Sequence, residues 1–335
     1  MSYIIYKKIN NLFEKVKDNF TSYIYKKKII DGLKKKFLGL NVETTNICNA
    51  DCIFCGYQFQ KRGTGVMESD LYHKIICEYN EIGGGNLGLT PTVGDPLVDK
   101  EIISKIKFAR GKKNINKIGF YSNLISLGRF NLSEFVNSGI TDITLSTSGF
   151  DKEMYKRVYR SNQYSKMFQN FINLLKENIK NSNPINIEVD MRTDKSLIET
   201  ESFEDYKKVL DFLPKEKIYC KFRYDDWAGK ILPKHLIGNM KIRNMLLSMR
   251  FRYSPCFEYF NGPHVYWNGD VGICGCRDVD AKELIIGDVN KTKLVDIWYN
   301  ELHLKYLNNF LKNTPTICSK CTHYDNISYF KKNFV

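Results

Sequence analysis

The sequence predicts an α/β protein whose main part is a partial (β/α)6 barrel of parallel strands, followed by a small, cysteine-rich α+β extension. Strand-like and helix-like runs alternate from residue 39 to residue 226, and helical crossovers are the ordinary connection between parallel strands. The alternation has ended by residue 256, where a group of closely spaced cysteines begins. These observations divide the chain into a barrel and a second, smaller unit.

Six strands are expected in the barrel, with helices between them. Short runs that are rich in β-branched and aromatic residues, bounded by Gly, Asn or Asp, are typical of strands. The strands are predicted at 39–45, 86–92, 117–123, 142–148, 186–192 and 218–225. The helices are predicted near 69–82, 99–111, 131–138, 151–180 and 203–212.

The later strands alternate apolar and polar residues. In 186–192, for example, the polar members are Glu188, Asp190 and Arg192. Side chains alternate between the two faces of a strand, whereas a strand that is buried on both faces is apolar throughout. We therefore predict that one face of the sheet packs on helices and that the other lines a polar cavity.

Composition excludes several classes of protein. No apolar run reaches the ~18 residues that suggest a membrane span, and the first residues lack a signal-peptide pattern, so we expect a cytoplasmic protein. In that reducing compartment, ten cysteines indicate metal binding rather than disulfides. The net charge of +14 fits a lysine-rich proteome or an acidic ligand, and no nucleic-acid-binding motif is present, so we expect no nucleic-acid partner.

Residues 1–38 contain ten lysines and apolar residues at helical spacing. This pattern predicts a basic amphipathic helical extension that precedes the barrel. Two interpretations are open. The helix either caps the main domain or makes peripheral contact with an anionic membrane surface.

The first cysteine group directly follows the first predicted strand. Cys48, Cys52 and Cys55 have the spacing C-x3-C-x2-C, and three thiolates so placed can hold three irons of a cubane cluster. A structural zinc site would need a fourth ligand close by, but the next cysteine, Cys77, lies within a predicted helix.

This motif, with the aromatic residue Phe54 before its third cysteine, resembles the signature of the radical S-adenosylmethionine (radical SAM) family. The resemblance implies a 4Fe–4S cluster whose free iron binds S-adenosylmethionine. It also implies that a flavodoxin- or ferredoxin-type donor drives cleavage of this molecule to a 5′-deoxyadenosyl radical, which abstracts hydrogen from the substrate. The hard chemistry then belongs to the cofactors, while the protein binds and orients the reactants.

The family also has polar turns after successive strands, and similar turns occur here. Thr92-Val93-Gly94-Asp95-Pro96 is similar to the family's Gly-Gly-Glu-Pro turn, although Val93 replaces one glycine and Asp95 replaces the glutamate. The resemblance assigns contacts with S-adenosylmethionine to Phe54, Gly94, Asp95, Ser122, Asn123, Ser146, Ser148, Arg160 and Arg192. For the polar members of this set, helix capping or a surface role is the alternative.

The second cysteine group comprises Cys256, Cys274, Cys276, Cys318 and Cys321. Two separated cysteine pairs can hold zinc. The spacing C-x12-G-x4-C with a late C-x2-C, however, resembles the SPASM/twitch extensions of radical SAM enzymes. The resemblance implies one auxiliary 4Fe–4S cluster on Cys256, Cys274, Cys318 and Cys321, with Cys276 as an alternative ligand, an idle thiol or a hydrogen-atom donor. The predicted domains are then 1–38, 39–240 and 241–335.

The organisation is similar to that of single-auxiliary-cluster aminocyclitol dehydrogenases. It implies oxidation of a sugar, cyclitol or nucleotide-sugar alcohol, with the auxiliary cluster as electron acceptor. The alternatives are modification of a peptide, epimerisation with Cys276 as hydrogen donor, and a non-catalytic zinc-holding module. Only 38 residues precede the first predicted strand, and they do not resemble the winged-helix domain through which many peptide-modifying relatives recruit a leader peptide.

Polar residues near the ends of the fifth and sixth strands are candidates for the chemistry itself. Asp225 or Asp226 is predicted to remove the substrate's proton, Arg223 to bind an anionic group and Trp227 to stack on a sugar ring. Structural ion pairs between neighbouring strands are the alternative for these charged residues.

Overall fold

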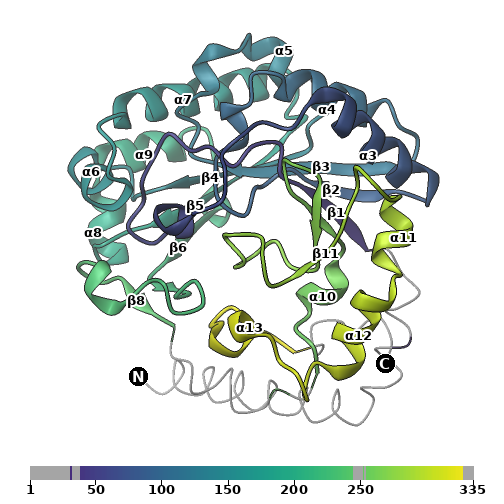
Figure 1. Cartoon of the computed structure of the whole chain (residues 1–335). Coiled ribbons are helices and arrows are strands. Elements are labelled where there is room, and N and C mark those ends of the chain that lie inside the picture. Colours follow the sequence, from purple (N-terminus) through teal and green to yellow (C-terminus); the bar gives the residue numbers. More distant parts are fainter. Residues whose placement is uncertain (1–30, 32–37, 244–251, 253, 327–335) are drawn as a thin grey trace.

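The structure is a computed structural model that describes residues 31, 38–243, 252 and 254–326. A nine-stranded sheet curves through it, with helices on the outer side (Figure 1). The predicted basic helix in residues 1–38 lies outside the described residues, apart from Asp31 and Leu38. Within the described part of the chain, no helix is long and apolar enough to cross a bilayer.

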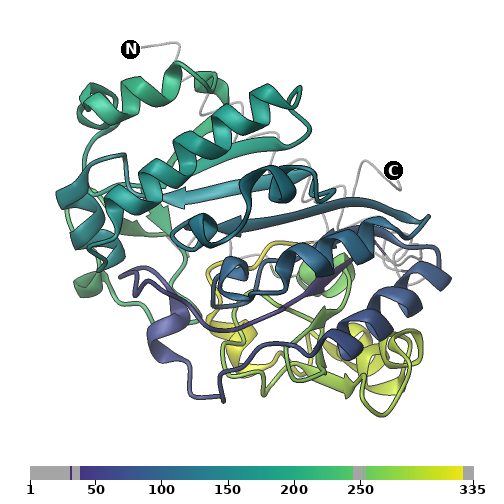
Figure 2. The ribbon, with the colours of Figure 1, turned by 90° about the horizontal axis from the view of Figure 1, so that it is seen from above.

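Six neighbouring strands of the sheet are parallel and follow chain order, as predicted. These strands are β1 (Gly39–Val42), β2 (Gly85–Gly88), β3 (Ile115–Ser122), β4 (Asp142–Thr147), β5 (Asn186–Arg192) and β6 (Ile218–Lys221). The helices between them are α3 (Ser69–Glu81), α4 (Ile102–Arg110), α5 (Leu132–Val136), α6 (Lys152–Tyr159), α7 (Tyr164–Lys180), α8 (Leu197–Ser202) and α9 (Glu204–Leu210). This arrangement confirms the partial barrel with its outer layer of helices (Figure 2).

The extension continues the same sheet. Strand β9 (His264–Val265) pairs in parallel with β1. The antiparallel strands β10 (Asp270–Gly272) and β11 (Ile285–Asp288) then follow, and the turn between β9 and β10 contains Asn268 and Gly269, a pair that favours tight hairpins. The short helices of this part are α10 (Glu258–Asn261), α11 (Leu294–Trp298), α12 (Glu301–Asn309) and α13 (Thr316–Lys320).

One face of the barrel sheet is apolar and buried, whereas the other carries polar side chains. In β5, Ile187, Val189 and Met191 are buried on the helix-covered side. Strand register places the following eight residues on the opposite face, which we call the polar face: Tyr121, Thr144, Ser146, Glu188, Asp190, Arg192, Tyr219 and Lys221. The predicted division of the sheet into an apolar and a polar side is therefore confirmed.

Two predicted elements are interrupted. The helix expected over 151–180 breaks at Arg160, whose backbone is left-handed with φ 49°. The strand expected over 218–225 stops at Lys221, and β7 (Arg223–Tyr224) pairs instead with β8 (Lys241–Ile242) in a separate two-stranded sheet. That pairing crosses the domain boundary predicted between residues 240 and 241. It links β7, which was predicted as part of the last barrel strand, to β8 at the start of the predicted extension.

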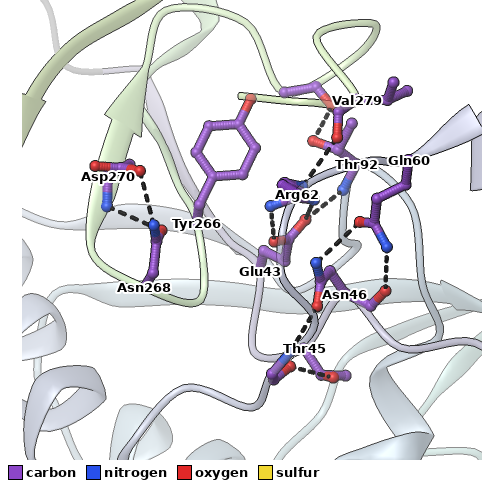
Figure 3. Close-up of polar contacts among 12 residues, drawn as sticks. Glu43, Thr45, Asn46, Gln60, Arg62, Thr92, Tyr266, Asn268, Asp270 and Val279 are labelled. Carbon is purple, nitrogen blue, oxygen red and sulfur yellow. Dashed lines mark hydrogen bonds and ion pairs between the residues drawn. The ribbon is translucent and has the colours of Figure 1, made fainter. Parts of the chain in front are cut away.

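A buried ion pair joins the barrel to the extension. Glu43, directly after β1, is fully buried, and Arg62 donates to both of its carboxylate oxygens, at 2.6 and 2.7 Å (Figure 3). The Nε of Arg62 donates to the carbonyl of Val279 at 2.9 Å, and its guanidinium lies 4.8 Å from the ring centre of Tyr266. Thus one cation holds the end of the first strand against two segments of the extension.

The end of β2 meets the same junction. The amide of Thr92 donates to Glu43 at 3.2 Å, and its hydroxyl donates to the carbonyl of Gly275 at 2.7 Å. His264 lies 3.2 Å from that hydroxyl, and burial lowers the pKa of its imidazole to about 3, which leaves it neutral. Neutrality suits this histidine, because a second cation beside Arg62 would be repelled.

We expect Arg62→Met to destabilise the protein by about 3–5 kcal/mol, since it leaves the buried carboxylate of Glu43 without its countercharge. Denaturant unfolding monitored by circular dichroism measures this change. The matched control is Lys107→Met, which breaks the exposed Lys107–Glu134 pair and should cost at most about 1 kcal/mol. Equal stability of the two variants would contradict the role given to Arg62.

Candidate active site and auxiliary metal centre

Three thiols lie together in the loop that follows β1. Cys52 is buried, and Cys48 and Cys55 are half-buried. Burial raises the pKa of all three thiols, and the charges of Cys55 and Cys48 raise that of Cys52 further. Thiolates that repel one another in a site shielded from water are stabilised by a bound cationic centre, so the donor set fits an iron–sulfur cluster.

Helix α6 holds the backbone of this cysteine loop. The amide of Ile53 donates to the carbonyl of Val158 at 3.0 Å, and the amide of Asp51 donates to that of Tyr159 at 3.3 Å. Arg160 follows the helix, and its guanidinium pairs with the Asp51 carboxylate at 3.2 Å. Arg160 therefore lies beside the cysteine loop and remains half-exposed, and its contact with S-adenosylmethionine stays a prediction.

The turn after β2 is built around a buried carboxylate. Asp95 is 2% exposed and accepts hydrogen bonds from the hydroxyl of Ser122 at 3.0 Å and from the amide of Asn123 at 2.7 Å. Burial raises the pKa of Asp95 to about 6. Gly94 has φ 133°, and a Cβ at this position would come within 2.9 Å of the Asn46 backbone. The turn thus requires glycine, and Asp95 fixes the next turn of the sheet.

Asn123 connects that turn to the first cysteines. Its side-chain nitrogen, Nδ2, donates to Asn49 Oδ1 at 2.7 Å and lies 3.9 Å from Cys48 Sγ. Gly94, Asp95, Ser122 and Asn123, which were predicted from separate parts of the sequence, are therefore gathered at one edge of the cysteine loop.

Arg192 lies at the opposite edge of the loop. Its guanidinium is 5.0 Å from the ring centre of Phe54 and donates to Ser146 Oγ at 2.8 Å. It also pairs with Asp190 at 3.0 Å, and Lys221 pairs with the same carboxylate at 2.5 Å. Asp190 thus pairs with one cation of its own strand and with one of the neighbouring strand β6. This pairing leaves Arg192 against the aromatic residue of the cysteine motif.

Ser148 has a buried hydroxyl that makes no hydrogen bond within the described part of the chain. A buried polar atom of this kind costs about 1–3 kcal/mol unless a ligand or water satisfies it. Its position after β4 is the one that the resemblance assigns to a contact with S-adenosylmethionine, and the free hydroxyl fits a polar ligand there.

The second cysteine group also converges. Cys256, Cys274, Cys276, Cys318 and Cys321 all line one opening with a free volume of about 360 Å³, part of it open to solvent. The phenol of Tyr259 lies 3.3 Å from Cys318 Sγ. Elements far apart in the sequence thus bring enough thiols to one place to hold a cluster through four cysteines.

Cys274 and Cys276 differ in their surroundings. The amide of Cys276 donates to Cys274 Sγ at 3.4 Å, and hydrogen bonding from Cys276 lowers the pKa of Cys274. Cys276 instead lies with Glu258 and His323, and the ligand atoms of these three residues are all within 4.8 Å of one another. The hydrogen bond that Cys274 Sγ accepts makes Cys274 the better candidate for a cluster ligand, and Cys276 remains the alternative.

Residues 225–227, which we call the strap, lie between the two cysteine groups. The indole of Trp227 donates to the carbonyl of Phe54 at 2.9 Å. The amide and the carboxylate of Asp226 bond to the hydroxyl of Thr322, both at 2.8 Å, next to Cys321. Asp225 forms an ion pair with Arg277, the residue after Cys276, at 2.5 Å. The strap therefore contacts both cysteine loops.

Two arginines differ from what the sequence analysis expects of the residues around the two cysteine groups. Arg223, in β7, is exposed and belongs to the separate two-stranded sheet. Arg277 was not predicted at all, although it touches the strap and lines the opening of the second cysteine group. Its position directly after Cys276 was the available signal, but sequence spacing does not reveal a partner 52 residues away.

Family comparisons agree with this geometry. The model of the Radical SAM superfamily matches residues 42–213, just over half of the chain. The chain belongs to the radical SAM superfamily. The model of the SPASM iron-sulfur cluster-binding domain matches residues 256–322, the segment that contains the second cysteine group.

Individual relatives are distant. A GTP 3′,8-cyclase from Vibrio atlanticus is 18% identical in an alignment of 330 positions that covers 86% of this chain and 96% of the cyclase. The structure of BtrN in complex with AdoMet and 2-DOIA superposes with a TM-score of 0.55 at 16% identity, covering 86% of this chain and 93% of BtrN. Streptococcus suis SuiB bound to the precursor peptide SuiA gives 0.60 at 14% identity, covering 91% and 76%.

As a radical SAM protein with a SPASM domain, the chain has 4Fe–4S clusters and S-adenosylmethionine as its cofactors. The three thiols after β1 and the five thiols of the extension are the groups that fit two such clusters. The match to the family model supports a radical SAM enzyme.

We expect Cys274→Ala to lose about half of the roughly eight irons that two cubane clusters contain, and Cys276→Ala to retain them. The reason is that Cys274 Sγ accepts a hydrogen bond from the backbone amide of Cys276, whereas the Cys276 thiol lies with Glu258 and His323. Iron and sulfide analysis of anaerobically reconstituted protein measures the difference. Loss of iron from Cys276→Ala with retention in Cys274→Ala would reverse the assignment.

Proposed function

We propose that this protein oxidises an alcohol of a sugar, cyclitol or nucleotide sugar to a carbonyl group. Cys48, Cys52 and Cys55 hold the cluster that binds S-adenosylmethionine. Cys256, Cys274, Cys318 and Cys321 hold the auxiliary cluster. Together these cofactors supply a carbon-centred radical, which takes the hydrogen atom from the alcohol carbon, and a site that accepts the electron left behind when the hydroxyl loses its proton.

The observation that carries this proposal is the complete thiol set of the extension, connected by the strap to the first cysteine loop. Five cysteines line one opening, so four can ligate every iron of a cluster. A fully ligated cluster has no vacant iron for substrate. Its remaining use is to exchange electrons, and alcohol oxidation requires an electron acceptor.

Substrate class follows from the polar face. Tyr121, Tyr219 and Lys221 remain about half exposed, at 46%, 48% and 49%, next to the ion pair of the buried Asp190 with the partly buried Arg192. Carboxylates, hydroxyls and cations in one surface offer many donors and acceptors to a ligand with several hydroxyl groups. The likeness to BtrN, an aminocyclitol dehydrogenase, is a likeness of fold and agrees with this choice.

The proton must be taken by a base, and Asp226 suits that role better than Asp225. The Asp225 carboxylate is already bound to Arg277 through two contacts, at 2.5 and 2.7 Å. The carboxylate of Asp226 accepts one hydrogen bond within the described residues, from Thr322. A carboxylate with an oxygen to spare can accept the hydroxyl proton.

The proposal also includes the electron donor, the cellular compartment and the roles of the two domains. A flavodoxin- or ferredoxin-type donor supplies the electron that cleaves S-adenosylmethionine. We place the enzyme in the cytoplasm, where its ten cysteines stay reduced. The barrel, residues 39–240, binds S-adenosylmethionine, and residues 241–335 form the auxiliary-cluster domain.

The decisive experiment gives anaerobically loaded enzyme S-adenosylmethionine, dithionite and separate panels of cyclitols, nucleotide sugars, GTP and peptides. We expect 5′-deoxyadenosine together with the loss of two hydrogens from an alcohol, detected by mass spectrometry. Cys52→Ala is the inactive control. An unchanged substrate mass with deuterium uptake from solvent would indicate epimerisation instead of oxidation. A modified peptide would indicate peptide maturation. A cyclised GTP would indicate the activity for which the Vibrio relative is named.

Asp226→Asn should lower kcat with the identified alcohol about 10²–10⁴-fold, because the general base is removed. Iron content and substrate-free cleavage of S-adenosylmethionine should not change. Asp296→Asn, on the exposed side of α11, is the matched control. An unaltered kcat for Asp226→Asn would dismiss the base role.

A further inference from the structure

Arg277 occupies the space between the two cysteine groups. Its Nε lies 2.5 Å from Asp225 Oδ1, and a terminal nitrogen donates to Oδ2 at 2.7 Å. The other terminal nitrogen donates to the carbonyl of Cys276. This two-point contact with a planar carboxylate fixes the guanidinium in position and orientation.

An aromatic ring covers the same cation. The guanidinium carbon lies 4.5 Å from the ring centre of Trp227, whose indole is held by the carbonyl of Phe54. Only 14% of the Arg277 side chain is exposed. A positive charge that is kept from water acts on its neighbours more strongly than an exposed one.

The packing leaves little freedom in this contact. A Cβ on Gly56, the residue after Cys55, would come within 2.5 Å of the Trp227 ring. The indole is thus pressed directly against the first cysteine loop. The cation that stacks on it lines the opening of the second cysteine group.

Arg277 contacts both cysteine groups. It stacks on Trp227, which bonds to the first cysteine loop, and it lines the opening of the second group and donates to the carbonyl of Cys276. Arg252 also approaches the second group, through the carbonyls of Cys318 and Cys321. Arg277 differs from it because Arg277 also stacks on Trp227, which is bonded to the first cysteine loop.

We propose that Arg277, held by Asp225 against Trp227, is a positioning residue that raises the reduction potential of the auxiliary cluster and so favours its acceptance of the substrate's electron. The benefit of a raised potential, acceptance of the substrate's electron, rests on the proposed function. The electrostatic effect of Arg277 on the potential of the cluster is measurable without any substrate.

The sign follows from charge. Reduction adds one negative charge to a cluster that its thiolates already make anionic, so a nearby cation stabilises the reduced form. The Asp225 carboxylate offsets part of that stabilisation while holding the cation in place. Removal of the cation should therefore lower the potential, and removal of the carboxylate charge should raise it.

The test is an EPR-monitored redox titration of the full chain carrying Cys48→Ala, Cys52→Ala and Cys55→Ala, so that the auxiliary cluster alone gives the signal. At a fixed potential, Arg277→Met should lower the ratio of reduced to oxidised cluster at least tenfold, a shift of about 59 mV for one electron. Arg277→Lys should recover part of the shift, and Asp225→Asn should shift the potential upward. The matched control is Arg157→Met, which breaks another Arg–Asp pair, Arg157–Asp194, and should leave the potential unchanged.

Opposite shifts for Arg277→Met and Asp225→Asn support the proposal, because a merely structural role would make both variants, which break the same ion pair, behave alike. Shifts in the same direction, or an unchanged potential in either variant with its iron retained, would overturn it. If Arg277→Met loses its iron, the upward shift in Asp225→Asn decides the matter alone. Failure of every substrate panel would remove the dehydrogenase function without affecting this result.

Discussion

The junction between barrel and extension depends on the buried pair of Glu43 and Arg62. Full burial of a carboxylate is tolerated because Arg62 meets both of its oxygens and the amide of Thr92 adds a third hydrogen bond. The same arginine binds the carbonyl of Val279, in the segment that follows Cys274 and Cys276. The relative placement of the two thiol groups therefore depends on satisfying one buried charge.

Each of the two thiol groups has an arginine beside it that is held by an aromatic ring and a carboxylate. Arg192 lies over Phe54 in the first cysteine loop, and Arg277 lies over Trp227 beside the second group. Each guanidinium stacks on an aromatic ring and pairs with an aspartate. Ring and carboxylate leave each cation few orientations, which suits residues that must hold a fixed field next to anionic centres.

The sequence predicted the strands well, because period-two alternation survives in the buried sheet. The range 186–192 is β5 itself, and the division into apolar and polar faces followed from Glu188, Asp190 and Arg192. The break after Lys221 was not predictable, since it depends on pairing with β8, about twenty residues later. Likewise, the thiol groups were visible as local motifs, whereas Arg277 and its carboxylate meet only through tertiary structure.

The parallel pairing of β9 with β1 bears on how the chain is made. During synthesis the first strand leaves the ribosome early, yet the neighbour on its second side is translated only at residues 264–265. Until then the nascent barrel presents an open edge, and the contact of Arg62 with Val279 forms later still. Completion of the sheet is therefore a late event in the biogenesis of this protein.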